Sequence, residues 1–129
     1  MNKFKLDTKL GIILCHAEIF KHDRPFVIKM ALDTGATYTL IPFEAAMAAG
    51  INPVRAKKQI EIVMGGGIVM APLIRVPSFK AFGYEVKNLE VICHNLPPES
   101  SVEGLLGLNF LTKFNVLLKF LENILEITK

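Results

Sequence analysis

Tryptophan is absent from this sequence, and the 129 residues include only two tyrosines and two cysteines. A small domain held together by several disulfides is therefore excluded. Cys15 and Cys93 lie in apolar runs, and each is followed by a histidine, His16 and His94. The ligand spacing of known zinc motifs is missing, and adjacent residues on a strand point to opposite faces. We expect neither a disulfide nor a metal site from these residues.

An excess of charge of one sign is also missing. The 15 basic and 12 acidic residues are scattered along the chain and leave a formal net charge of +3, with Lys57-Lys58 as a short basic pair. Such a distribution provides no basic surface for a nucleic acid. We expect no nucleic-acid partner.

Long hydrophobic runs are missing too. The longest nearly uncharged stretch, residues 62–74, is too short to span a bilayer and is interrupted by three glycines and a proline. The first residues interleave charged and apolar side chains and lack the continuous apolar core of a signal peptide. The sequence therefore predicts a cytoplasmic protein with no membrane partner.

Apolar residues are abundant, because 51% of the chain is hydrophobic and 21% is charged. A chain of this length can bury one core, so we expect a single domain over residues 1–129. Short runs rich in Ile, Val, Leu and Phe alternate with turn residues, a pattern typical of an all-β sandwich or barrel. The expected strands are residues 3–6, 11–20, 26–32, 37–41, 59–64, 68–73, 75–82, 84–93, 116–120 and 124–127.

Two short helices and one glycine-rich hairpin interrupt this β pattern. Residues 42–49 begin with a proline and end before Gly50, which favours a helix, and residues 109–114 are expected to form a second one. Gly65-Gly66-Gly67 separates two expected strands. Its residues can adopt positive φ angles, so this hairpin is a candidate flap.

One tripeptide carries recognisable chemistry. Asp33-Thr34-Gly35 follows directly after the expected strand 26–32. Alone it is weak evidence, because Asp and Gly are common in ordinary turns. The context is stronger, because Leu105-Leu106-Gly107 appears later in the chain and the glycine-rich hairpin lies between the two motifs.

With Met30-Ala31-Leu32 before it and Ala36 after it, the tripeptide resembles the active-site segment of the retropepsin-like aspartic protease family. That family pairs such a segment with a later apolar-apolar-Gly segment. The resemblance covers most of the chain and is strongest to bacterial and archaeal single-domain members. It implies a closed acid-protease-type barrel with a Gly-rich flap hairpin and one or two short helices.

The resemblance also implies an aspartic endopeptidase. The chemistry requires two carboxylates facing each other across one water, and this chain has a single Asp-Thr-Gly, so the family pattern implies a homodimer with one Asp33 from each subunit. Thr34 would bond to the partner loop, and Gly35 would let backbone approach the carboxylate and the substrate. The implied substrate-binding residues are Ala36, Thr37, Gly65, Gly66 and Gly67. A peptide or protein substrate is expected, with no cofactor.

Two positions depart from the retroviral members, in which an acidic residue and an arginine pair with each other. Here these positions hold Thr37 and Leu108. Both charges are missing together, so no unpaired charge is left. An alternative from another functional class is a dimerising or peptide-binding module with weak or no catalysis, which a monomer in solution would favour.

Overall fold

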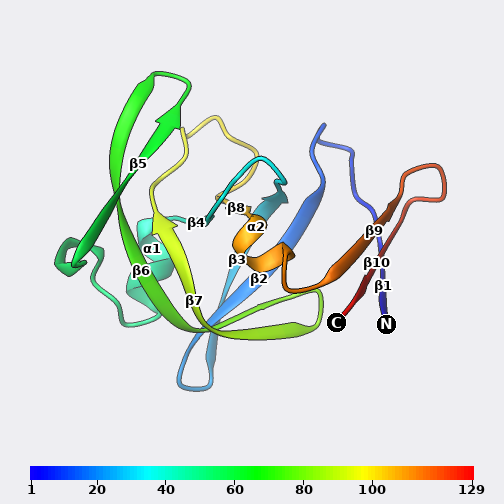
Figure 1. Cartoon of the computed structure of the whole chain (residues 1–129), viewed down its shortest axis with the longest axis horizontal. Helices are drawn as coiled ribbons and strands as arrows, with labels where there is room; N and C mark the ends of the chain where they lie inside the picture. The colour runs from blue at the N-terminus through cyan, green and yellow to red at the C-terminus, as the bar shows by residue number, and fades with distance from the viewer.

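A computed structural model describes all residues from 1 to 129 and consists mainly of β-strands (Figure 1). The strands are β1 (Asn2–Lys5), β2 (Leu14–Lys21), β3 (Arg24–Leu32), β4 (Thr39–Ile41), β5 (Lys58–Met64), β6 (Gly67–Ala81), β7 (Tyr84–Cys93), β8 (Gly104–Leu106), β9 (Asn115–Lys119) and β10 (Ile124–Thr128). The helices are α1 (Phe43–Ala48), the short 3-10 helix η1 (Pro53–Arg55) and α2 (Leu108–Leu111). None of these helices has the length and apolar character needed to cross a membrane.

Six strands close into a barrel. They are hydrogen-bonded in the order β2-β3-β8-β4-β7-β6, and β6 pairs again with β2. The β3–β8 and β4–β7 pairs are parallel, whereas the other pairs are antiparallel. This arrangement confirms the closed all-β barrel predicted from the sequence. It also brings the ends of β3 and β8, which carry the two motifs, side by side.

The flap hairpin extends one edge of this sheet. β5 pairs only with the first part of β6, and the glycine-rich tip projects away from the barrel (Figure 1). The sequence predicted two strands at 68–73 and 75–82, but β6 is one continuous strand. Pro72 lies where β6 has only β5 as a partner, and Pro77 lies at a break in the β6–β7 ladder. Neither proline therefore removes a hydrogen bond from a strand paired on both sides.

The helices cover the barrel close to where the sequence predicted them. Pro42 is the N-cap of α1, and buried Ala45 and Ala46 pack against the core. The second helix, α2, is shorter than predicted because Thr112 already serves as its C-cap. The η1 turn was not predicted; there the side chain of Asn52 accepts a hydrogen bond from Val54 N at 3.1 Å.

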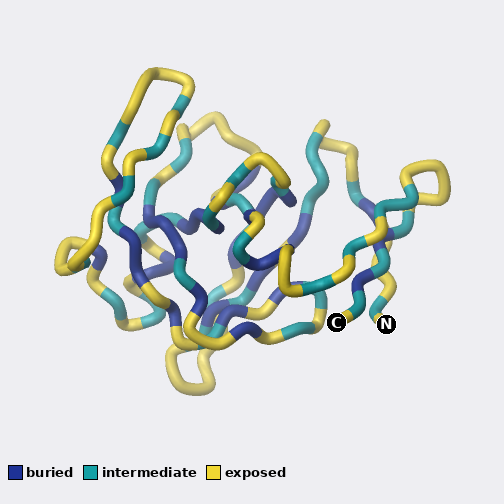
Figure 2. Tube along the Cα trace, in the orientation of Figure 1, coloured by how far each residue is buried: buried dark blue, intermediate teal, exposed yellow.

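The core fills the barrel and reaches under the second sheet (Figure 2). Phe79 of β6 and Phe110 of α2 are fully buried and meet edge to face, with ring centroids 5.5 Å apart. Their contact fixes α2 against the barrel. The second sheet has three strands in the order β1-β10-β9 and contains both chain termini. Its Leu125 and Ile127 belong to the same core cluster as the barrel residues.

Candidate active site

The loop after β3 holds the carboxylate of Asp33 in place from within the chain. Asp33 N donates to the Leu106 carbonyl at 2.9 Å, and Gly35 N donates to Asp33 Oδ1 at 2.8 Å. A Cβ on residue 35 would lie 3.2 Å from that oxygen, so glycine suits the tight turn. Asp33 is half-buried, and its second carboxylate oxygen makes no hydrogen bond within this chain. That oxygen is therefore available to another group.

The second motif lies directly behind this loop. Leu108 N donates to the Ala36 carbonyl at 2.8 Å, and Asn109 N donates to the Thr37 carbonyl at 3.2 Å. A Cβ on Gly107 would lie 2.7 Å from the Tyr38 carbonyl group and 2.8 Å from the Ala36 oxygen. Only a glycine permits this approach without a shift of the backbone. The Asp-Thr-Gly loop and the Leu-Leu-Gly segment thus form one packed unit.

Two side chains that were not among the predicted site residues connect this unit. Asn109 Oδ1 accepts hydrogen bonds from Thr39 N at 2.8 Å and from Thr39 Oγ1 at 2.9 Å. Gly107 N donates to Thr39 Oγ1 at 3.1 Å, and Asn109 Nδ2 donates to the Glu90 carbonyl. Thr39 is fully buried, so its N–H and its hydroxyl depend on these hydrogen bonds in place of water. The network joins α2, β4 and β7 beneath the Asp33 loop.

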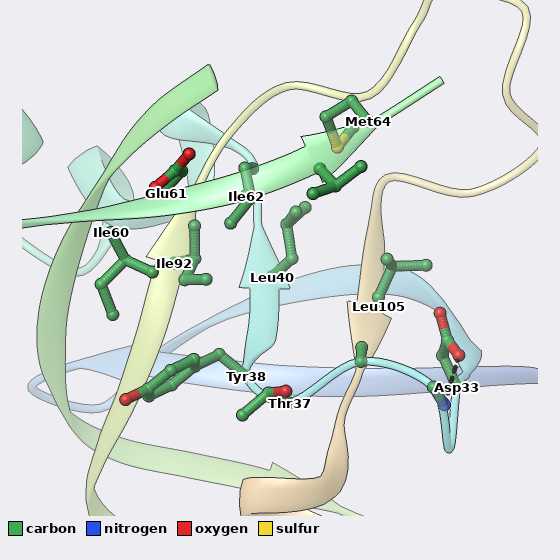
Figure 3. A pocket seen from close by; sticks show the side chains of 13 residues that line it. Asp33, Thr37, Tyr38, Leu40, Ile60, Glu61, Ile62, Met64, Ile92 and Leu105 are labelled. Carbon is green, nitrogen blue, oxygen red and sulfur yellow. Dashed lines mark hydrogen bonds between the residues drawn. The ribbon is translucent and has the colours of Figure 1, made fainter. Parts of the chain in front are cut away.

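A pocket of about 500 Å³ lies between the Asp33 loop and β5 (Figure 3). Of its 13 lining residues, 9 are hydrophobic, and its charged side chains are Asp33 and Glu61. The lining residues are Asp33, Gly35, Ala36, Thr37, Tyr38, Leu40, Ile60, Glu61, Ile62, Val63, Met64, Ile92 and Leu105. Asp33 stands at one end, and Tyr38, Ile60 and Ile92 form the other (Figure 3). The hollow therefore joins a carboxylate to an apolar channel.

Four of the predicted catalytic and substrate-binding residues meet in this pocket, namely Asp33, Gly35, Ala36 and Thr37. Gly65, Gly66 and Gly67 do not line it; they are exposed at the tip of the β5–β6 hairpin (Figure 2). The hairpin instead contributes the side chains of β5. The alternation of side chains along residues 59–64 predicts a strand, but it does not show which face of that strand points toward the barrel.

Thr34 faces a different hollow on the other side of the loop. This groove has a volume of about 290 Å³ and lies among the Asp33 loop, α2 and β9. It is lined by Leu32, Thr34, Leu108, Leu111, Thr112, Phe114, Val116 and Leu118, and is called the Thr34 groove below. The Asp33 loop thus separates a substrate-sized pocket from a second, mostly apolar depression.

Neither cysteine lines the pocket or the Thr34 groove. Burial raises the pKa of Cys15 and of Cys93 from 9.0 to about 12. Both thiols are therefore protonated at neutral pH and are poor nucleophiles. His16, beside Cys15 in β2, is exposed. No three His, Cys, Asp or Glu side chains in the structure lie close enough to share a metal ion.

The closed barrel, the Asp-Thr-Gly loop backed by an apolar-apolar-Gly strand, and the hairpin over the pocket define the class of retropepsin-like aspartic proteases. Residues 22–113 match the family described as "gag-polyprotein putative aspartyl protease", and the chain belongs to that family.

A solved structure has the same fold over the whole chain. The retropepsin-like aspartic protease from Rickettsia conorii superposes with a TM-score of 0.70 and 22% sequence identity, and the match covers 99% of each chain. At this identity the likeness concerns the fold alone. Among curated protein sequences, none matches this chain at a significant level.

Proposed function

We propose that this protein is an aspartic endopeptidase that acts as a homodimer, with one Asp33 from each subunit in a shared active site. The observation that carries the proposal is the free carboxylate oxygen of Asp33 at one end of the apolar pocket. The loop that presents it is fixed from behind by Gly107 and α2. Such rigid support is what a positioned catalytic group requires.

The requirement for a second subunit follows from the number of carboxylates. Hydrolysis by this class needs two aspartates around one water, and the chain supplies a single Asp-Thr-Gly. Two-fold symmetry provides the other copy. Residues 1–129 would serve as one domain in each subunit, since both sheets share one core. Thr34, which faces away from the pocket, would meet the partner's loop.

The proposed reaction uses the pair of carboxyl groups as base and acid. At a separation of about 3 Å the two groups share one proton, because both cannot ionise. The ionised carboxylate removes a proton from the water, whose oxygen attacks the scissile carbonyl carbon, while the protonated carboxyl donates to the carbonyl oxygen. When the tetrahedral intermediate collapses, the C–N bond breaks, the leaving nitrogen takes the proton that the first carboxyl removed from the water, and the second carboxylate takes back the proton of the hydroxyl that becomes the carbonyl.

The substrate would be an extended peptide in the pocket between the loop and β5. Ala36 and Thr37 would contact it from the loop side, and Ile60 and Ile62 would contact its side chains from β5. The exposed hairpin tip at Gly65, Gly66 and Gly67 would close over it as a flap. A Cβ on Gly65 or Gly66 would meet no atom within 4 Å, so the tip has room to move.

The test is cleavage of a diverse peptide mixture between about pH 4 and pH 7, where a carboxyl pair that shares a proton can act as acid and base. Wild-type cleavage should rise faster than linearly with protein concentration. Asp33→Asn should reduce it by at least about 10²- to 10⁴-fold. The matched control is Asp23→Asn, which changes an exposed aspartate in the β2–β3 turn and should cleave like wild type.

The opposite result is equally clear. A wild-type protein that is folded and dimeric but cleaves nothing would contradict the proposal. The domain would then be a dimerising or peptide-binding module.

A further inference from the structure

A basic cluster lies where β5 begins. Arg55 of η1, Lys57 and Lys58 are all exposed and follow one another closely in the chain. The ion pairs of the structure involve only Lys3 and Lys119, so the three cations have no acidic partner within the chain. They are called the Lys58 cluster below. Unpaired positive charge gathered at one place attracts an acidic partner.

Lys58 shares the face of β5 that points into the pocket. Side chains alternate along a strand, so Lys58 lies on the same face as Ile60 and Ile62. Both isoleucines line the pocket, and Ile60 belongs to the end that lies away from Asp33 (Figure 3). Lys58 is therefore the next side chain of this face beyond that end. The row runs from apolar side chains inside the pocket to a cation just outside it.

The far end of the pocket also offers a hydrogen-bond donor. The ring of Tyr38 lies along the wall opposite β5, and its hydroxyl is directed toward the same end as Ile60 (Figure 3). Tyr38 is half-buried there. A phenolic O–H can donate to a carboxylate. A polar group and a free cation thus adjoin each other where the apolar lining ends.

The acidic side chains of the same sheet do not cancel this charge. Glu61 follows Ile60 directly and points to the opposite face of β5, where its cross-strand neighbour is Met70 (Figure 3). Glu90 of β7 lies opposite Arg75 of β6, so these two charges offset each other. The pocket-facing row of β5 therefore ends in a positive charge with no carboxylate beside it.

We propose that the Lys58 cluster is an outer subsite that binds an acidic segment of the substrate, several residues away from the bond that is cleaved. The inference rests on the proposed function and specifies its substrate class. An extended peptide advances about 3.3 Å per residue, so one that follows β5 from Met64 to Lys58 passes about six residues. In a homodimer, two-fold symmetry supplies a second cluster on the other side of the cleaved bond. The preferred substrates then carry acidic residues on both flanks of an apolar stretch.

The experiment measures the binding of two labelled peptides to the Asp33→Asn protein by fluorescence anisotropy, so that cleavage does not consume them. Both peptides have the same apolar core; one carries glutamates at both ends and the other carries lysines. At low salt the acidic peptide should bind about threefold or more tightly. This preference should shrink in about 1 M salt, where charges are screened within about 3 Å.

Charge reversal at one residue tests the position of the subsite. Lys58→Glu, added to the same protein, should reverse the preference between the two peptides. The matched control is Lys87→Glu, which changes the net charge equally at an exposed position of β7 and should keep the preference. Lys58→Ala covers the case in which Lys58→Glu does not fold, and it should lower the preference by about twofold. Circular dichroism shows whether each variant is folded.

Equal binding of the two peptides, binding of neither, or an equal effect of Lys87→Glu would overturn the acidic outer subsite. So would a preference that persists in a folded Lys58→Glu protein. Cleavage of other peptides by the wild-type protein would leave the protease proposal intact in each of these cases. A preference that reverses in Lys58→Glu, while the wild-type protein cleaves no peptide, supports the outer subsite and contradicts the protease.

Discussion

Two glycine-containing regions lie on opposite sides of the candidate site, and they use glycine for opposite reasons. Gly107 is buried, and a methyl group there would collide with the backbone of Tyr38 and Ala36. Gly65 and Gly66 lie at the exposed hairpin tip with open space around them. Glycine thus permits close packing in the first region and movement in the second.

The surroundings of the two regions differ in the same way. Below the Asp33 loop, the buried hydroxyl of Thr39 is fully hydrogen-bonded to Gly107 and Asn109. On the flap hairpin, Val63 is 81% exposed and its cross-strand neighbour Ile68 is also exposed. The fold therefore holds the Asp33 carboxylate firmly in place, whereas the flap hairpin above the pocket is only weakly held.

Replacing each glycine by alanine should separate the two regions most strongly. Gly107→Ala should lower the free energy of unfolding by about 1 to 3 kcal/mol, because the backbone around the loop must shift to admit the methyl group. Gly66→Ala should leave it unchanged or raise it by up to about 1 kcal/mol, because the unfolded chain loses freedom. Urea unfolding measures both, and equal losses for the two variants would refute the contrast.

A smaller effect is expected at Thr39, where one hydroxyl can be removed with little change of shape. Thr39→Val should cost about 1 to 3 kcal/mol, because the N–H of Gly107 loses its acceptor in a buried place. Thr39→Ser keeps the hydroxyl and should recover most of this loss. Thermal unfolding compares the three proteins, and equal melting temperatures for the Val and Ser variants would show that the hydrogen bonds contribute little.

The sequence predicted the features that depend on neighbouring residues, whereas it missed those that depend on contacts between distant residues. The Asp-Thr-Gly loop, the later Leu-Leu-Gly segment and the glycine-rich hairpin are short local patterns, and all three lie where the sequence predicted. The Thr39–Asn109 hydrogen bonds join residues far apart in the chain, and neither residue stands out in its local pattern. The inward side of β5 likewise depends on how that strand packs, so Ile60 and Ile62 were missed.

The position of Thr34 also depended on the three-dimensional arrangement. The resemblance placed it in the active-site triplet, but only the fold shows that it faces a groove with α2 and β9 rather than the pocket. Similarly, the sequence predicted separate strands at residues 68–73 and 75–82, where β6 is one continuous strand. The strand continues through Pro72 and Pro77 because neither proline removes a hydrogen bond from a position of β6 that is paired on both sides.

The most direct test of a shared active site is a mixing experiment. Wild-type subunits are allowed to exchange with a growing excess of Asp33→Asn subunits, and peptide cleavage is followed. If each site needs one Asp33 from each subunit, an equal mixture that exchanges at random keeps about a quarter of its dimers fully wild type. Cleavage per wild-type subunit should then fall to about half and approach zero with excess variant. Cleavage per wild-type subunit that stays constant would contradict the shared site.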